Sequence, residues 1–323
     1  MAADDVLAPL DQTLAGSDIS SSPWITAEDG ERVYLPDYDI ARALLNIPVS
    51  GGYAQQQQTG RVAKALDSWI AHELRRAGFP PDAVWPRQQQ PRTISGDLGA
   101  AEAAIGEAQA RMETFEKALD AYTAKQGGKA PSLKLPKASI NAIAKALPGT
   151  ANAEILGRFY VKQVDVVMSS WQRGPEVLVS SKTQFSSYLN NKNNRYEEAV
   201  GEAFNLRDRY PMAAMGFAFL VRTNLFDEQG AFVYLRNQLA RLRAPDGPFD
   251  ATMLLAADWD DSDAPVVRKV DDADEVLSAP KFFEDLIEAV LRNTPIDLHQ
   301  EVRLRQLGSQ PETGMPPTDE EPL

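Results

Sequence analysis

Two stretches of the sequence carry a carboxylate and an ammonium at positions that neighbouring strands would bring together. Asp165 interrupts the apolar alternation of QVDVVMSS, and PEVLVSSKTQ contains Ser180 and Lys182 near its end. In phosphodiester hydrolysis, a carboxylate can fix a divalent cation against the scissile phosphate, and a lysine can orient the attacking water and stabilise the developing charge. The alternative is a cross-strand ion pair, worth less than about 1 kcal/mol when exposed. The residue types are therefore compatible with metal-dependent hydrolysis or with a solvated strand end.

The segment SSWQRGP between these stretches has the composition of a turn. We therefore expect the strands on either side to form a hairpin centred between Gln172 and Arg173. Because side chains alternate between the two faces of a strand, one face should be mostly apolar, with Val164, Val166, Met168, Val177, Val179 and Ser181. The other face should pair Asp165 with Ser180, Val167 with Leu178 and Ser169 with Glu176, and should carry Lys182 at the same end as Asp165.

The order of these features resembles the PD-(D/E)XK nuclease superfamily, which has the restriction-endonuclease-like fold. An aspartate on one strand (Asp165) is followed by a second strand ending in SSK, then by a helix and an apolar strand, over roughly residues 150 to 225. The same stretch is similar to uncharacterised restriction-type proteins of bacterial defence loci. The resemblance implies a DNA endonuclease that uses Mg²⁺ or Mn²⁺, in which Asp165 holds the metal and Lys182 is catalytic.

One position departs from the family pattern. The family usually has an acidic residue two positions before the lysine, and this chain has Ser180 there. Glu176 is on the same face, but four residues at about 3.3 Å each place it roughly 13 Å away. In one branch of restriction enzymes the following helix supplies the missing acid. The helix NNRYEEAVGEAF offers Glu197, Glu198 and Glu202.

We expect Glu198 to act as the replacement, as a catalytic residue and metal ligand, with Glu197 as the next candidate. The alternative is a solvated helix edge with an Arg195–Glu198 pair. A further metal ligand, Glu154, is expected from the preceding helix, as in some members of the family. Gln184 continues the Lys182 face and is a candidate for the site or an ordinary strand-end residue.

The loop NNKNNR carries Lys192 and Arg195 at a helix start, where cationic side chains could contact DNA phosphates. A plain surface turn is equally compatible with this composition. Arg87 in the helical region is a further DNA-clamping candidate, and the others are Arg92, Lys129, Lys134 and Lys137.

The rest of the chain predicts a mixed α/β fold. Helical periodicity over 59–77 and 98–125 precedes a region in which short apolar strands alternate with helices near 194–209, 230–243 and 280–292. We expect a restriction-endonuclease-like mixed-sheet core with an added N-terminal helical region. The expected divisions are an extension at 1–50, a helical region at 51–130, the α/β catalytic core at 138–300 and an acidic, disordered tail at 301–323.

The composition excludes several other classes. The chain has no cysteine and only two histidines, His72 and His299, which argues against thiolate chemistry and zinc hydrolysis. A net charge of -13 disfavours a protein that simply coats nucleic acid. Nucleotide-binding glycine loops and the GxSxG motif are missing from the sequence, as are a membrane span and a signal peptide, so we expect a cytoplasmic protein.

These features together predict a Mg²⁺-dependent endonuclease of double-stranded DNA, of a type II-like restriction or phage-defence kind. The resemblance further implies a homodimer, with a DNA methyltransferase as the partner that protects the host. One rival is a catalytically degenerate nuclease fold that serves as a DNA- or protein-interaction module. A second is an RNA-directed or single-strand nuclease.

Overall fold

A computed structural model describes residues 6–54, 59–88, 96–124, 153–170, 172–190, 192–243 and 245–308. Its helices are α1 (Ala8–Leu14), α2 (Tyr38–Ser50), α3 (Thr59–Arg76), α4 (Gly96–Ala124), α6 (Lys192–Arg207), α7 (Ala231–Arg243), α8 (Ala279–Asn293) and α9 (Gln300–Leu307). The strands are β1 (Trp24–Thr26), β2 (Arg32–Tyr34), β3 (Val84–Trp85), β4 (Ala153–Leu156), β5 (Val161–Val164), β6 (Val166–Ser170), β7 (Gly174–Gln184), β8 (Ala214–Arg222), β9 (Ala251–Asp258) and β10 (Lys269–Asp272).

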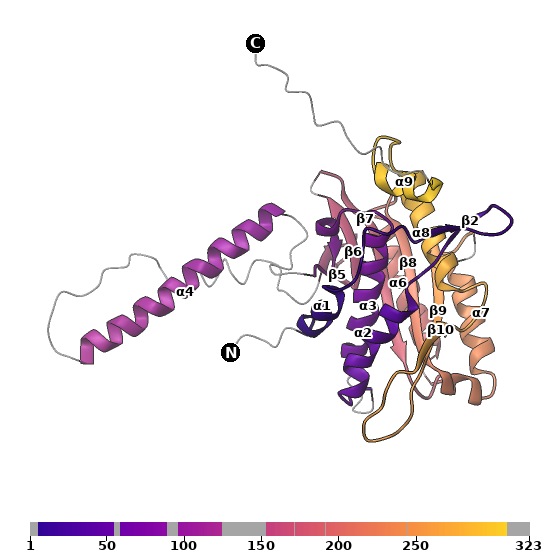
Figure 1. The fold of residues 1–323 in the computed structure, drawn as a ribbon, viewed down its shortest axis with the longest axis horizontal. Coiled ribbons are helices and arrows are strands. Elements are labelled where there is room, and N and C mark those ends of the chain that lie inside the picture. Colours follow the sequence, from indigo (N-terminus) through magenta and orange to yellow (C-terminus); the bar gives the residue numbers. More distant parts are fainter. Residues whose placement is uncertain are drawn as a thin grey trace, which may run out of the picture.

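A six-stranded mixed sheet forms the centre of the molecule (Figure 1). Its strand order is β10-β9-β8-β7-β6-β3. The three central strands β7, β8 and β9 are parallel, and β6, β3 and β10 pair with their neighbours antiparallel. The expected α/β class is therefore confirmed.

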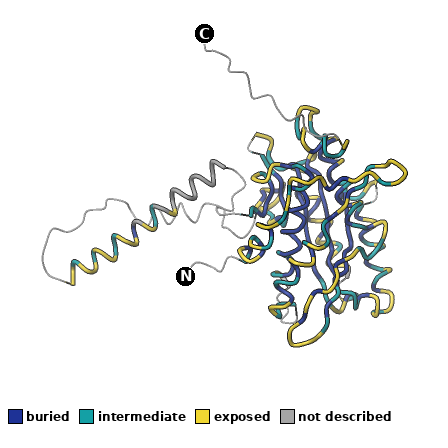
Figure 2. Tube along the Cα trace, viewed as in Figure 1, coloured by how far each residue is buried: buried dark blue, intermediate teal, exposed yellow. Residues whose placement is uncertain are grey.

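Helices cover both faces of this sheet, as the apolar alternation of its strands requires. One core packs α1, α2, α3 and α8 against residues such as Val166, Val177 and Val179. The second core packs α6 and α7 against Val167, Leu178 and other residues of the opposite face. Buried segments are concentrated in these layers (Figure 2), whereas α4 projects from them and its described side chains are exposed or half-buried except for Met112.

The strand expected over KQVDVVMSS is broken at Asp165. Residues 161–164 form β5, which pairs with β4 in a separate two-stranded sheet, and only β6 joins the central sheet. The helix that was expected to carry Glu154 is wrong, because residues 153–156 form strand β4. Val164 consequently packs in the α6–α7 core and not with Val166.

The β6–β7 hairpin has the expected pairing over Val166–Met168 and a different pairing near its turn. Val167 lies opposite Leu178, as predicted. A register shift between Met168 and Ser169 then places Ser169 opposite Pro175, so the predicted Ser169–Glu176 pair is wrong. A bulge of this kind inserts an extra residue that no sequence periodicity reveals.

The residues before 130 contribute directly to the main core. Trp24, Tyr34 and Trp69 are buried in the same cluster as residues of β6, β9 and α8, and β3 is an edge strand of the central sheet. Helix α9 occupies part of the range expected as a tail, while 309–323 lies outside the described residues, as do Arg92, Lys129, Lys134 and Lys137. Within the described ranges, every helix is too short or too polar to cross a bilayer.

Candidate active site at the end of β7

The last residues of β7 project alternately toward α3 and α6. On the α3 side, the Ser181 amide donates a 2.9 Å hydrogen bond to Asp165 Oδ2, and the Ser181 hydroxyl donates to Asp67 Oδ1. Lys64 Nζ lies 3.0 Å from Asp67 Oδ2 and 3.9 Å from Asp165 Oδ1. Two carboxylates thus meet around one lysine and one serine.

The break between β5 and β6 explains the position of Asp165. Asp165 is the single residue between the two strands. Its side chain therefore does not follow the alternation of either strand, and its carboxylate reaches the backbone of β7. Helix α3 brings Asp67 and Lys64 because its broad apolar face, with Val62, Leu66 and Ile70, packs against the sheet. Asp67 itself is fully buried (0% exposed).

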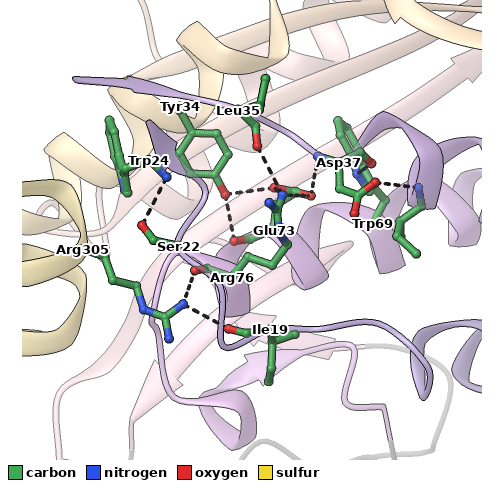
Figure 3. Close-up of polar contacts among 11 residues, drawn as sticks. Ile19, Ser22, Trp24, Tyr34, Leu35, Asp37, Trp69, Glu73, Arg76 and Arg305 are labelled. Carbon is green, nitrogen blue, oxygen red and sulfur yellow. Dashed lines mark hydrogen bonds and ion pairs between the residues drawn. The ribbon is translucent and has the colours of Figure 1, made fainter. Parts of the chain in front are cut away.

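A second polar network fixes the other end of α3 (Figure 3). The buried Glu73 carboxylate accepts hydrogen bonds from the Tyr34 hydroxyl at 3.0 Å and from the Asp37 amide at 3.1 Å, and pairs with Arg76 at 2.7 Å. Arg305 of α9 donates to the carbonyls of Ile19 and Arg76. Burial raises the pKa of Glu73, and Arg76 opposes this effect. The network ties the C-terminal turn of α3 to the segment after β2 and to α9.

On the α6 side, Glu202 takes the place next to Ser180. Its Oε2 accepts a hydrogen bond from the Ser180 hydroxyl at 3.4 Å, and its Oε1 pairs with Lys162 and lies 3.5 Å from Lys182 Nζ. Lys182 also contacts Glu198 at 3.3 Å. Glu202 is buried (3% exposed), whereas Glu198 is exposed. The helix therefore does bring an acid to the serine position.

The pKa values of Asp165 and Lys182 are both raised, but for different reasons. Burial, reinforced by the neighbouring Asp67, raises the pKa of Asp165 to about 7, although Lys64, the Ser181 amide and Lys182 oppose the rise. Burial works against the charge of Lys182, but Glu202, Glu198 and Asp165 outweigh it and raise its pKa. Lys182 is therefore an ammonium at neutral pH, able to donate hydrogen bonds but not to accept a proton.

Lys64 and Glu198 have also shifted pKa values. Burial disfavours the charge of Lys64, but the Asp67 and Asp165 carboxylates raise its pKa overall. Partial burial would raise the pKa of Glu198, yet Lys182 lowers it overall. Both groups are therefore charged at neutral pH.

The α3 side has oxygen donors and a deficit of positive charge. Asp165 and Asp67 share one lysine, whereas Glu198 and Glu202 share two, Lys182 and Lys162. Mg²⁺ typically keeps several waters and is bound by one or two carboxylates together with substrate phosphates. No three His, Cys, Asp or Glu side chains of the described ranges form a ready metal-binding group. The pair Asp165–Asp67 nevertheless has the donor chemistry and the excess negative charge that suit Mg²⁺.

Several predicted site residues lie away from this cluster. Glu154 is on β4, not on a helix, and is exposed opposite Gln163. Glu197 is on the exposed side of α6. Gln184 donates to the carbonyls of Ser186 and Ser187, and so holds the loop after β7.

The predicted DNA-contacting residues lie at the start of α6. Lys192 is the first residue of the helix, and Arg195 is exposed beside an apolar hollow that includes Phe217 and Phe219. Glu198 pairs with Lys182, and not with Arg195 as the alternative of a solvated helix edge would require. Arg87 pairs with Asp82.

Asp67, Lys64 and Lys162 were not predicted as site residues from the sequence, and Glu198 was preferred to Glu202. Helical spacing offered a signal for Asp67, because Ala63, Ile70 and Ala71 lie three or four residues from it on the same helix. Glu202 is likewise adjacent to the buried Ala203. Helical periodicity indicates that a position is buried, but it does not indicate which other residues surround it.

Comparisons of this chain with protein-family models, with curated proteins and with solved structures give no match.

Proposed function

We propose that this chain is a Mg²⁺-dependent (or Mn²⁺-dependent) endonuclease of double-stranded DNA with a restriction-endonuclease-like core. The observation that supports the proposal is the pair Asp165–Asp67, which shares the ammonium of Lys64, while Lys182 on the other side of β7 is near enough for its charge and that of Asp165 to affect each other's pKa. Phosphodiester hydrolysis needs both features, a place for a divalent cation and a donor near the attacked phosphorus.

In the proposed reaction, Asp165 and Asp67 hold the cation. When bound, the ion lowers the pKa of its water and neutralises charge on the phosphate. Lys182, held by Glu198 and Glu202, orients the attacking water and donates to the phosphate oxygen that gains charge. A bond forms between the water oxygen and phosphorus while the bond to the leaving sugar oxygen breaks, the water proton passes to solvent and the leaving oxygen takes up a proton.

The biological setting that best suits this activity is restriction or phage defence in the cytoplasm, with a homodimer cutting both strands. A cognate DNA methyltransferase would then protect the host. These elements rest on the resemblance of the D…SSK segment to restriction-type proteins and on fold-level analogy.

A degenerate nuclease fold that acts as an interaction module is the second candidate, and Ser180 in place of the usual acid favours it. The two candidates differ in cleavage of methylated and unmethylated plasmid and phage DNA with Mg²⁺. We expect discrete fragments from the parent protein and none from Asp165→Ala or Lys182→Ala, with Glu197→Gln as the matched control that retains activity. Absence of cleavage, together with absence of Mg²⁺ binding by calorimetry, would instead support the interaction module.

A further inference from the structure

The β4–β5 hairpin ends in a cluster of exposed apolar side chains. Phe159 is 63% exposed and Phe204 of α6 is 59% exposed, and their rings stack at a centroid distance of 6.1 Å. We call this surface the aromatic tip, and it consists of Leu156, Phe159, Tyr160, Val161 and Phe204, all exposed. Contiguous exposed apolar surface of this kind usually marks an interaction site.

The aromatic tip is built rigidly. The side chain of Asn205, which is buried, accepts a hydrogen bond from the Phe159 amide at 2.8 Å and donates to the Tyr160 carbonyl at 3.1 Å. A Cβ at Gly157 would lie 2.1 Å from Asn205 Nδ2, so only glycine lets the turn close on this clamp. The backbone that carries Phe159 and Tyr160 is thus held in one conformation.

The aromatic tip is also close to the candidate active site. Lys162, on the same hairpin, pairs with Glu202, and Glu202 lies 3.5 Å from Lys182. The alternation of β5 directs Lys162 to the site and its neighbour Val161 to the exposed face. Lys162 and Glu202 therefore connect the aromatic tip to the catalytic Lys182.

Arginine side chains lie against aromatic rings at the aromatic tip and next to it. Arg158 lies over the Phe159 ring at 5.1 Å, and Arg209 lies over Tyr210, whose hydroxyl bonds the Leu156 carbonyl. Asp208 pairs with Arg158 at 2.6 Å. Cations interleaved with aromatic rings are the combination that stacks bases and tracks their phosphates. Because Arg158 and Lys162 are paired with Asp208 and Glu202, the alternation of arginines and rings, and not a net positive charge, favours a nucleic acid as the occupant.

We propose, on the basis of the proposed nuclease function, that the aromatic tip stacks an unpaired base next to the cleaved phosphodiester. Bases inside a duplex offer no free ring face, so the occupant is a base that is single-stranded or extruded from the helix. The substrate of this site is accordingly DNA that is locally unpaired beside the cut.

The test uses DNA oligonucleotides that carry 2-aminopurine, in single-stranded form, in an intact duplex and in a duplex with an unpaired stretch. Binding and fluorescence are measured without divalent metal for the parent and for Phe159→Leu, Phe159→Tyr and Phe204→Leu. We expect quenching on unpaired 2-aminopurine with the parent and with Phe159→Tyr. Phe159→Leu should lose the quenching and bind about tenfold more weakly, since stacking on one ring contributes an effect of this size.

Phe226→Leu is the matched control, because Phe226 is 52% exposed on a different part of the molecule. It should leave quenching and affinity unchanged. The inference is overturned if Phe159→Leu quenches like the parent, or if it binds DNA normally but shifts the oligomeric state in sedimentation, which would assign the surface to a second copy of the chain. If one of these two results is found and the parent still cleaves DNA with Mg²⁺, the base-stacking role of the aromatic tip fails and the proposed nuclease function stands. If the parent neither binds nor cleaves DNA, the proposed function fails with it.

Discussion

The two sides of β7 carry equal numbers of carboxylates but unequal numbers of lysines. On the α6 side, Glu198 and Glu202 are balanced by Lys182 and Lys162. On the α3 side, Asp67 and Asp165 form ion pairs with Lys64 alone among the described residues, and Lys182 affects the pKa of Asp165 without pairing with it. The balanced side is suited to holding Lys182 in place, and the unbalanced side is suited to accepting a cation.

Exchanging one acid on each side should give the largest effect. Asp67→Asn removes a donor from the cation-poor side and should lower Mg²⁺ affinity and cleavage by about a hundredfold or more, because metal ions contribute several kcal/mol to such reactions. Glu198→Gln, on the balanced side, should lower cleavage by less than about tenfold. Calorimetry and cleavage rates measure both. Equal losses in the two variants would refute the difference between the sides.

Exchanging one lysine on each side should separate catalysis from metal binding. Lys182→Met should reduce kcat about a hundredfold, the cost of removing one donor to the developing charge. Lys64→Met leaves two carboxylates without a cation, so the variant should be destabilised without metal and should gain more thermal stability from Mg²⁺ than the parent does. A thermal melt with and without Mg²⁺ decides the point. The same gain in Lys182→Met would show that the lysines are interchangeable.

The two glutamates of α6 should differ in their contribution to stability. Glu202→Gln leaves Lys162 and Lys182 next to a neutral amide in a buried position, and should lower the free energy of unfolding by about 1–3 kcal/mol. Glu198→Gln affects an exposed carboxylate and should cost less than about 1 kcal/mol. Urea unfolding of both variants at neutral pH provides the comparison. A greater loss for Glu198→Gln would contradict the burial of Glu202.

The sequence predicted the helices and strands on both sides of β7 better than it predicted which residues meet there. Alternation identified β6, β7, β8 and β9, and periodicity identified α3, α6, α7 and α8, since these patterns follow directly from burial of one face or one stripe. The break at Asp165 was missed because apolar residues continue on both sides of it without glycine or proline. Asp67 was missed because its partners, Asp165 and Ser181, are distant in sequence and meet it only in the fold.

The same reason accounts for the choice of glutamate on α6. Glu198 and Glu202 are one turn apart and equivalent by periodicity. They are distinguished by the contacts of Glu202 with Ser180 of β7 and with Lys162 of the β4–β5 hairpin. Glu154 was placed on a helix because AEIL, taken alone, is compatible with either a helix or a strand.

The last comparison concerns the pH dependence of stability without metal. The pKa of Asp165 in the folded protein is raised from 3.8 to about 7, so the folded state binds a proton that the unfolded state releases. The stabilisation from this proton is complete below about pH 4 and is lost as the pH rises through about 7, with a slope of at most about 1.4 kcal/mol per pH unit. Asp165→Asn cannot titrate and should lack this component. The measured quantity is the difference in unfolding free energy between the parent and Asp165→Asn in EDTA from pH 5 to pH 8.

Asp67→Asn sharpens the same measurement, because it removes the neighbouring charge that helps to raise the pKa of Asp165. Its loss of stability should therefore occur at lower pH than in the parent. Mg²⁺ should have a related effect, since a bound cation favours the ionised carboxylate and must displace the proton below about pH 7. Mg²⁺ affinity should accordingly rise with pH up to about 7 and then level off. An affinity that is constant from pH 5 to pH 8 would mean that Asp165 is not the residue that meets the cation.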